Sequence, residues 1–371
     1  MNKQYFIQTY GCEMNAHESE KIAGILEKHG YQPCGYADEA DFVVINTCCI
    51  RESSEDLVFE MLDHISQIKQ YYVPLKVAVC GCLTQQEGKA EEVLKKYPFI
   101  DYILGTHNIS ELDRLLKEDA KQQSIIEKTD GYINENVPIS RGTFPTAWVN
   151  IIYGCNNFCS YCIVPYVRGR ERSRTMESVL NEVKELAAAG YKEIILLGQN
   201  VNSYGKDLKD GTSFAKLLTA VNAIPGDFVV KFTSSHPKDF TEDVIDAVAQ
   251  GGKIIPYIHL PVQSGSNKIL AAMNRKYTRE QYIDLVKRIR DKIPHAYITT
   301  DIIVGFNGET EEDFRDTISL VNECNFANAF CFAYSKRKGT AGWDMEGEVP
   351  EDIKQARLGY ISSLFYPNVM T

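Results

Sequence analysis

The 371-residue sequence lacks the features that would direct it into a membrane or out of the cell. No run approaches the roughly 18 consecutive apolar residues that a transmembrane helix needs. Residues 1–5 lead into a predicted strand without the apolar stretch of a signal peptide. Eleven cysteines in a chain without an export signal favour a reducing compartment, where thiols bind metals rather than pair as disulfides. We therefore expect a cytoplasmic protein.

The sequence also lacks an excess of positive charge: its formal net charge is -10. This balance disfavours a general affinity for nucleic acid. One local exception is a run of four arginines, Arg168, Arg170, Arg172 and Arg174, and a smaller cluster is formed by Lys336, Arg337 and Lys338. The arginine run has two interpretations at this point: a solvated loop, or a loop that holds a cofactor or a phosphate-bearing substrate.

A fourth metal ligand is absent beside the most conspicuous motif of the chain. Cys155, Cys159 and Cys162 form a C-x3-C-x2-C pattern, and the next histidine is His236. A zinc site usually needs a fourth Cys or His nearby, whereas three soft thiolates suit a cubane iron–sulfur cluster. Three ligands for four irons leave one iron open, and an open metal position is where a small molecule binds.

This spacing, in a loop between a predicted strand and a helix, resembles the radical S-adenosylmethionine (SAM) superfamily. The resemblance implies that the open iron binds the amino and carboxylate groups of SAM. It also implies that one electron from the cluster cleaves SAM to a 5′-deoxyadenosyl radical, and that a protein such as a flavodoxin or ferredoxin donates the electron.

The first 118 residues alternate between predicted strands and helices. Strands are predicted at residues 5–10, 42–47, 77–79 and 102–105, and helices at 15–28, 52–70, 85–96 and 109–116. This order predicts an α/β fold in which residues 1–118 form a doubly wound parallel-sheet domain. Residues 119–145 are polar and contain several Gly and Pro, so we interpret them as a linker.

Three further cysteines, Cys12, Cys48 and Cys82, each come just after a predicted strand of this domain. The carboxyl ends of parallel strands meet at one edge of a sheet, which is where ligands of open α/β sheets bind. Three strands can therefore deliver three thiolates to one place, and we predict a second three-cysteine cluster site there.

The combination resembles the methylthiotransferases, which carry an auxiliary [4Fe-4S] cluster in an amino-terminal domain beside a radical-SAM barrel. The matching stretches are residues 10–15, 46–52 and 81–82. The resemblance implies two [4Fe-4S] clusters, with Cys12, Cys48, Cys82, Cys155, Cys159 and Cys162 as the metal ligands. We interpret the other cysteines, Cys34, Cys49, Cys80, Cys324 and Cys331, as buried thiols.

Residues 146–371 are predicted to form the radical-SAM core and a terminal helix. Strands are predicted at residues 147–153, 193–199, 228–234, 257–262, 297–305 and 328–334, and the clearest helices at 278–293 and 311–324. Six units match the partial (βα)6 barrel of the superfamily, although the count alone also fits a truncated eight-unit barrel.

Polar residues at the carboxyl ends of these strands are the candidates for binding SAM. They are Gln199, Asn200, Ser235, Gln263, Asp301 and Gly305. Residues 301–306 are similar to the adenine-contacting strand of the family, except that Asn307 stands where proline is usual. His236 and His259 are interpreted as structural, and no residue is assigned as catalytic.

Residues 164–174 and 196–205 resemble the tRNA-modifying branch of the methylthiotransferases. This resemblance implies methylthiolation at C2 of N6-dimethylallyladenosine at position 37 of tRNA, with SAM as methyl donor and radical source. The implied partner is the anticodon arm of tRNA, and we expect a monomer. The family's carboxyl-terminal TRAM domain, an RNA-binding module, has no room before Thr371, so we expect it to be absent and tRNA binding to be weak.

Three alternatives remain at this stage. One is a methylthiotransferase that acts on threonylcarbamoyl-adenosine in tRNA or on a ribosomal protein. Another is a cobalamin-dependent radical-SAM methyltransferase, although residues 1–118 contain no D-x-H-x-x-G motif for binding cobalamin. The third is a non-catalytic iron–sulfur or tRNA-binding remnant.

Overall fold

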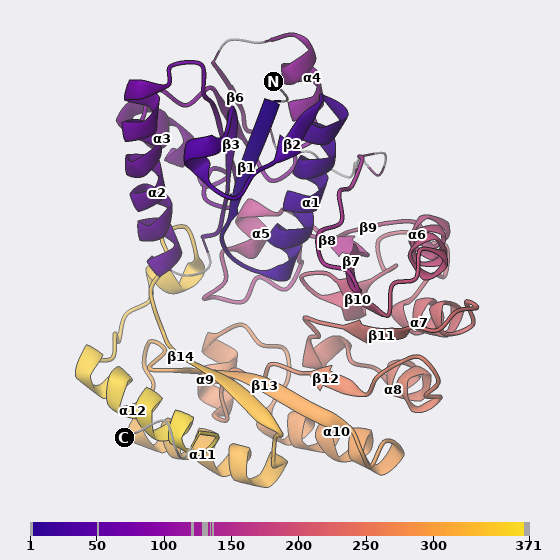
Figure 1. The fold of residues 1–371 in the computed structure, drawn as a ribbon. Coiled ribbons are helices and arrows are strands. Elements are labelled where there is room, and N and C mark those ends of the chain that lie inside the picture. The colour runs from indigo at the N-terminus through magenta and orange to yellow at the C-terminus, as the bar shows by residue number, and fades with distance from the viewer. Residues whose placement is uncertain are drawn as a thin grey trace. The chain divides into compact units, whose positions relative to one another are not determined.

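The computed structural model describes residues 3–366, except residues 50–51, 120–121, 128–132, 134 and 136. The chain forms two compact units (Figure 1). Unit 1 comprises Met1–Phe144 together with Ile163–Arg172, and unit 2 comprises Pro145–Cys162 together with Ser173–Thr371. The short segment that follows Cys162 therefore packs with unit 1.

Unit 1 is built on a six-stranded parallel sheet in the order β2-β1-β3-β4-β5-β6. The strands are β1 (Lys3–Thr9), β2 (Tyr31–Pro33), β3 (Phe42–Thr47), β4 (Lys76–Gly81), β5 (Tyr102–Leu104) and β6 (Gln123–Ile125). The helices are α1 (Glu13–Lys28), η1 (Ala37–Glu39), α2 (Glu52–Tyr71), α3 (Lys89–Lys96), α4 (Glu111–Lys117) and α5 (Val164–Val167).

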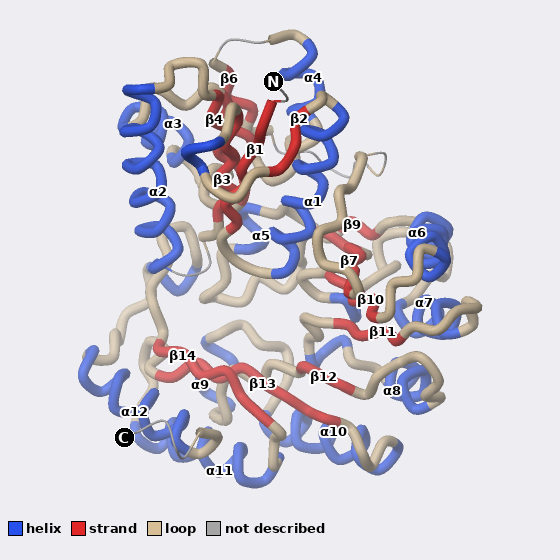
Figure 2. Tube along the Cα trace, in the orientation of Figure 1, coloured by secondary structure: helices blue, strands red, loops and turns tan. Residues whose placement is uncertain are grey.

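Helices cover both faces of this sheet, which confirms the predicted doubly wound domain. Figure 2 shows α2 and α3 on one side of the strands and α1 on the other. Every residue of β3 is buried, with Val43 and Ile45 packed toward α2 and α3, and Phe42 and Val44 packed toward α1 and α4. A strand that is apolar on both faces gains hydrophobic stabilisation from two layers, which explains its continuous apolar run.

Two strands of unit 1 were missed by the sequence analysis. β2 and β6 are three residues long and lie at the two edges of the sheet. Edge strands pair on one side only, so β2 can include Pro33 and β6 can expose Gln123 and Ser124. β6 lies in the stretch that we interpreted as a linker.

Unit 2 is a partial barrel with six parallel strands among its described residues, as predicted. One sheet has the order β11-β10-β7 and the other β12-β13-β14, and a parallel bridge between Val230 and Ile254 joins β11 to the segment before β12. These strands are β7 (Thr146–Asn150), β10 (Glu193–Leu197), β11 (Val229–Phe232), β12 (Tyr257–His259), β13 (Tyr297–Val304) and β14 (Asn328–Ala333).

The helices of unit 2 lie outside these strands (Figure 1). They are α6 (Met176–Ala188), α7 (Phe214–Asn222), α8 (Glu242–Ala249), α9 (Asn267–Ala272), α10 (Arg279–Lys292), α11 (Glu311–Cys324) and α12 (Glu351–Ser363). Shorter elements are β8 (Ile152–Tyr153), η2 (Val201–Ser203), η3 (Pro237–Asp239) and η4 (Ala341–Trp343), and β9 (Arg172–Ser173) spans the boundary between the units.

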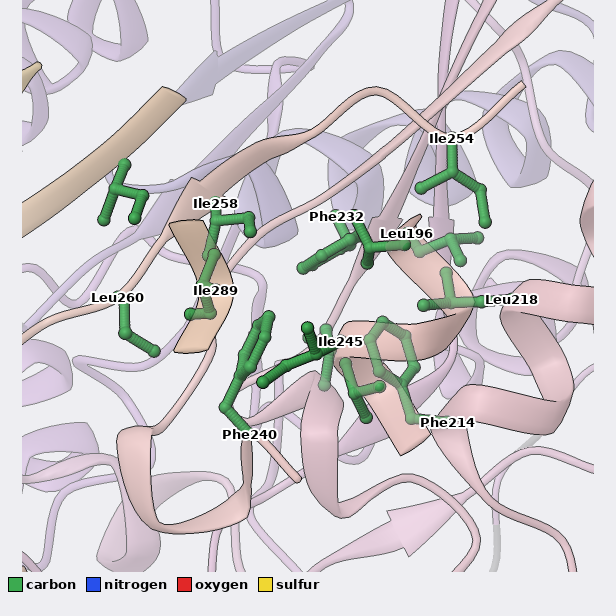
Figure 3. Close-up of a cluster of buried hydrophobic side chains, with 14 of the residues drawn as sticks. Leu196, Phe214, Leu218, Phe232, Phe240, Ile245, Ile254, Ile258, Leu260 and Ile289 are labelled. Atoms are coloured by element: carbon green, nitrogen blue, oxygen red, sulfur yellow. The ribbon is translucent and has the colours of Figure 1, made fainter. Parts of the chain in front are cut away.

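The core of unit 2 lies between the strands and the outer helices. Figure 3 shows Leu196, Phe232 and Ile258 of the strands beside Phe214 of α7 and Ile245 of α8. Capping boxes define where two helices begin, at Thr278 for α10 and at Thr310 for α11. In the described part of the chain, no helix is long and apolar enough to cross a membrane.

The packing of α1 gives a prediction for the stability of unit 1. A Cβ atom at Gly24 would lie 2.3 Å from the carbonyl oxygen of Pro138, whose segment is bound to α1 through the Ser140 N–H and the Glu20 carbonyl. We expect Gly24→Ala to lower the free energy of unfolding by about 1–3 kcal/mol through overpacking. Denaturant titration of apo protein measures this. Gly35→Ala is the control, because no described atom lies within 4 Å of its Cβ position, and an equal cost for both substitutions would contradict the packing.

Candidate functional sites

The order of strands in unit 1 brings the three separated cysteines to one edge of the sheet. β1, β3 and β4 are neighbours, and Cys12, Cys48 and Cys82 follow them at the same end. Cys12 is also the N-cap residue of α1. The predicted placement of the three cysteines is therefore confirmed, while their role as ligands stays a prediction.

The backbone carbonyl of Thr47 ties the three cysteine loops together. Its oxygen accepts hydrogen bonds from the Cys82 N–H at 3.0 Å and from Nδ2 of Asn15 at 2.9 Å. The same Nδ2 donates to the Tyr10 carbonyl at 2.8 Å, just before Gly11 and Cys12. Asn15 is completely buried, so these bonds are shielded from water.

The side chain of Thr47 adds a second connection between the Cys48 and Cys82 loops. Its hydroxyl donates to the Cys80 carbonyl at 2.6 Å and accepts from the Leu83 N–H at 3.2 Å. The loops approach so closely that two glycines are required. A Cβ atom at Gly11 would lie 2.7 Å from Cβ of Cys48, and one at Gly81 would lie 2.4 Å from the Thr47 oxygen.

A buried arginine completes this site. Arg168 donates to Glu18 at 2.7 Å and to Oδ1 of Asn15 at 2.6 Å, and its charge acts on Cys82 and Cys12. The Cys49 thiol hydrogen-bonds to Cys82, which lowers the pKa of Cys82 and raises that of Cys49.

The structure corrects the interpretation of the arginine run as a solvated loop. Arg168, Arg172 and Arg174 are buried, and only Arg170 of the four is exposed. Arg172 donates to the Arg168 carbonyl at 3.1 Å, and Arg174 pairs with Glu182 at 2.5 Å. Three of the four are thus structural groups within their units and do not face a phosphate backbone. The four closely spaced arginines suggested a basic surface, because the charge of a residue does not show whether its side chain is buried.

The packed cysteines of unit 2 lie in the loop between β8 and α5. Cys155 and Cys159 are buried, and Cys162 is half-buried. Asn274 fixes the loop by donating to the carbonyls of Asn157 and Phe158, at 3.2 and 2.8 Å.

Two side chains donate directly to sulfur in this loop. Nδ2 of Asn157 lies 3.5 Å from Sγ of Cys155, and Nη1 of Arg275 lies 3.5 Å from Sγ of Cys159. Hydrogen bonds to ligand sulfurs tune iron–sulfur clusters. Sequence reasoning missed Arg275, because it lies more than a hundred residues from the cysteines and belongs to no ligand motif.

Three of the six predicted SAM-binding residues carry buried polar atoms that have no described protein partner. These atoms are Oδ1 of Asn200, Oγ of Ser235 and Oε1 of Gln263, each beyond the carboxyl end of a barrel strand. Buried polar atoms are almost always hydrogen-bonded, so unpaired atoms gathered at this edge fit a bound polar ligand. Two hydrogen-bond acceptors and a hydroxyl suit the polar groups of SAM.

The other three predicted SAM-binding residues, Gln199, Asp301 and Gly305, have polar neighbours within the protein. Gln199 accepts a hydrogen bond from the Gly154 N–H, beside Cys155, and Asp301 is half-buried with Oδ2 3.4 Å from Nε2 of His259. The Gly305 N–H donates to Glu309 at 2.7 Å, so this amide is already committed within the protein. Their contact with SAM remains a prediction.

His236 has the environment of a structural histidine. Burial, together with the charge of Arg275, lowers its pKa to about 2. Its Nδ1 accepts from the Lys238 N–H at 3.2 Å, and its ring lies against Tyr277. A neutral imidazole of this kind is no proton donor near neutral pH.

The cysteines of both sets are free thiols. None of the eleven cysteines, all of which are described, forms a disulfide. Among the described residues, no group of three Cys, His, Asp or Glu side chains converges on one ion position. Soft thiolates, three to a set, are the kind of ligand that a cubane iron–sulfur cluster uses.

Known proteins resemble the chain over almost its full length. Residues 149–321 match the Radical SAM superfamily, and residues 4–105 match Uncharacterized protein family UPF0004. The tRNA-2-methylthio-N(6)-dimethylallyladenosine synthase of Clostridium tetani is 54% identical over 95% of the chain and 79% of the relative. That of Carboxydothermus hydrogenoformans is 51% identical over 96% of the chain and 82% of the relative. The chain belongs to this synthase family.

Solved structures support the fold. The radical SAM methyltransferase TsrM from Kitasatospora setae, with cobalamin and a [4Fe-4S] cluster bound, matches with a TM-score of 0.69 over 92% of the chain and 77% of that protein, at 14% identity. The radical SAM enzyme OxsB with aqua-cobalamin gives a TM-score of 0.63 over 97% of the chain and 56% of that protein. At such low identity, the likeness of these proteins to a member of the synthase family concerns the fold alone.

The hydrogen bonds of the Thr47 carbonyl and hydroxyl, here called the Thr47 junction, predict that removing the hydroxyl weakens the cysteine site of unit 1. Thr47→Val keeps the side-chain shape but leaves the Cys80 carbonyl and the Leu83 N–H without this partner. We expect the free energy of unfolding of apo protein to fall by about 1–3 kcal/mol. Denaturant titration measures it. Thr219→Val is the control, since its exposed hydroxyl donates to the Ala215 carbonyl of its own helix; an equal loss in both variants would contradict the junction.

Proposed function

We propose that the chain methylthiolates C2 of N6-dimethylallyladenosine at position 37 of tRNA, with SAM as methyl donor and radical source. The observation that carries this proposal is the pair of three-cysteine sites, one in each unit, in a member of the synthase family. A single cluster would suffice to cleave SAM, so a second site in unit 1 points to a further task, the delivery of sulfur.

In this proposal each unit has its own part. Cys155, Cys159 and Cys162 hold the radical-SAM cluster, and Cys12, Cys48 and Cys82 hold the auxiliary cluster. Clusters and SAM supply the one-electron chemistry that an unactivated C2–H bond requires, since acid–base groups alone cannot replace its hydrogen. The protein contributes placement and exclusion of water.

Residues of the chain perform the placement. The unpaired oxygens of Asn200, Ser235 and Gln263 would bind the polar groups of SAM at the carboxyl ends of the barrel strands. The Thr47 junction would hold the auxiliary ligands at fixed spacing, and Arg168 would offset part of their negative charge. The proposed partners are the anticodon arm of tRNA and an electron donor such as a flavodoxin or ferredoxin.

Cysteine variants separate the two sites. Anaerobically reconstituted protein should contain about eight irons, and a variant that loses one of the two cluster sites should contain about four fewer. Cys159→Ala should abolish 5′-deoxyadenosine formation from SAM and dithionite, because the radical-SAM cluster loses one of three protein ligands. Cys48→Ala should retain that activity but form no methylthiolated tRNA. Iron analysis and chromatography of both products measure these outcomes.

Cys324→Ala is the matched control, because Cys324 is buried at the end of α11 and belongs to neither set. It should keep both activities. Methylthiolated tRNA from the Cys48→Ala variant would overturn the auxiliary site, and wild-type protein that binds SAM and tRNA without any turnover would overturn the enzymatic function.

The choice of target is tested separately. Dimethylallyl-tRNA, threonylcarbamoyl-tRNA and the ribosomal-protein substrate are offered side by side to the reconstituted enzyme. We expect product from the first alone, and faster product from either of the others would reassign the substrate.

A further inference from the structure

Arg275 is a buried cation beside the cysteine loop of unit 2. Its guanidinium uses all three nitrogens: Nε donates to the Tyr277 hydroxyl at 2.7 Å, Nη2 to the Pro261 carbonyl at 2.6 Å, and Nη1 to Sγ of Cys159 at 3.5 Å. The side chain is 7% exposed, and the guanidinium also lies over the Tyr277 ring, 5.0 Å from its centre.

Three other buried arginines each pair with a carboxylate, whereas Arg275 does not. Arg168 pairs with Glu18, Arg174 with Glu182, and Arg357 with Glu309. Among the described residues, no carboxylate lies within ion-pair distance of Arg275. Burying a charge without a counter-charge costs several kcal/mol. A protein therefore keeps such a buried cation where a negatively charged group lies against it. The groups in contact that can carry negative charge are the Tyr277 hydroxyl and the sulfur of Cys159, and only the sulfur belongs to a predicted metal ligand.

The position of Arg275 is fixed from several sides. Tyr277, which accepts from Nε, donates in turn to the Val262 carbonyl at 2.8 Å, and its ring contacts His236. The preceding residue, Asn274, holds the peptide groups of Asn157 and Phe158. The segment between α9 and α10 therefore supports both the backbone of the cysteine loop and the charge beside it.

We propose that Arg275 is a positioning residue that orients Cys159 and raises the reduction potential of the cluster bound by Cys155, Cys159 and Cys162. The inference rests on the proposed function, since it takes these three cysteines as ligands. A positive charge and an N–H donor beside a ligand sulfur stabilise the reduced cluster, which carries one more negative charge than the oxidised cluster. A higher potential makes the cluster easier for an electron donor to reduce, and it makes the reduced cluster a weaker electron donor toward SAM by the same amount.

The test uses protein in which Cys12, Cys48 and Cys82 are replaced by Ala, so that only the unit 2 cluster forms. Its midpoint potential is measured by redox titration followed by electron paramagnetic resonance, without SAM. Arg275→Met should shift the potential to a more negative value, whereas Arg275→Lys, which keeps the charge, should lie closer to the parent. Arg279→Met is the control, because Arg279 pairs with Glu323 and should leave the potential unchanged.

Two results would overturn the role of Arg275: a loaded Arg275→Met cluster at the parent potential, or equal shifts for the Met and Lys variants. A failure of the proposed function looks different. In that case the parent protein itself, with Cys155, Cys159 and Cys162 intact, takes up no iron after reconstitution.

A second measurement does not depend on cluster loading. A double-mutant cycle combines Cys159→Ala with whichever Arg275 variant folds, and the unfolding of apo protein is followed in denaturant. Because Arg275 and Cys159 contact each other, the two substitutions should cost less together than the sum of their separate costs. Additive costs would show that the contact carries no energy and would contradict the inference.

Discussion

Parallel pairing of neighbouring strands is the constraint on which both candidate sites depend. The strand pairs of the three main sheets run parallel, so the carboxyl ends of neighbouring strands meet at one edge. In unit 1 this brings together cysteines that are far apart in sequence. In unit 2 it places Asn200, Ser235 and Gln263 beyond strand ends, and their oxygens have no hydrogen-bond partner among the described residues. Local hydrogen bonds then refine an arrangement that the sheet has already set.

Compensation of charge is the second requirement that the two sites share. In the proposed function, three thiolates and a cluster at each site would concentrate negative charge, and such charge needs partners. Unit 1 supplies Arg168 and unit 2 supplies Arg275. The two arginines differ in their own pairing, because Glu18 already offsets Arg168. Their influence on a bound cluster should therefore differ, although both are buried.

Much of this could be predicted from the sequence. β3 and α11 have the predicted bounds, since a continuous apolar run and a Thr-x-x-Asp capping box are strong local signals. The six cysteines were found from spacing and from their positions after strands. The edge strands β2 and β6, the burial of Arg172 and Arg174, and the contact of Arg275 with Cys159 were not predicted. Each of these features depends on which distant segment of the chain packs against it, and the local sequence pattern does not determine that packing.

Transfer of hydrogen from the substrate tests the central claim most directly. Dimethylallyl-tRNA that carries deuterium at C2 of adenosine 37 is incubated with reconstituted enzyme, SAM and reductant, and the 5′-deoxyadenosine is analysed by mass spectrometry. The account predicts that deuterium lost from C2 appears in 5′-deoxyadenosine as methylthiolated tRNA forms. Unlabelled 5′-deoxyadenosine together with tRNA that keeps its deuterium would contradict it.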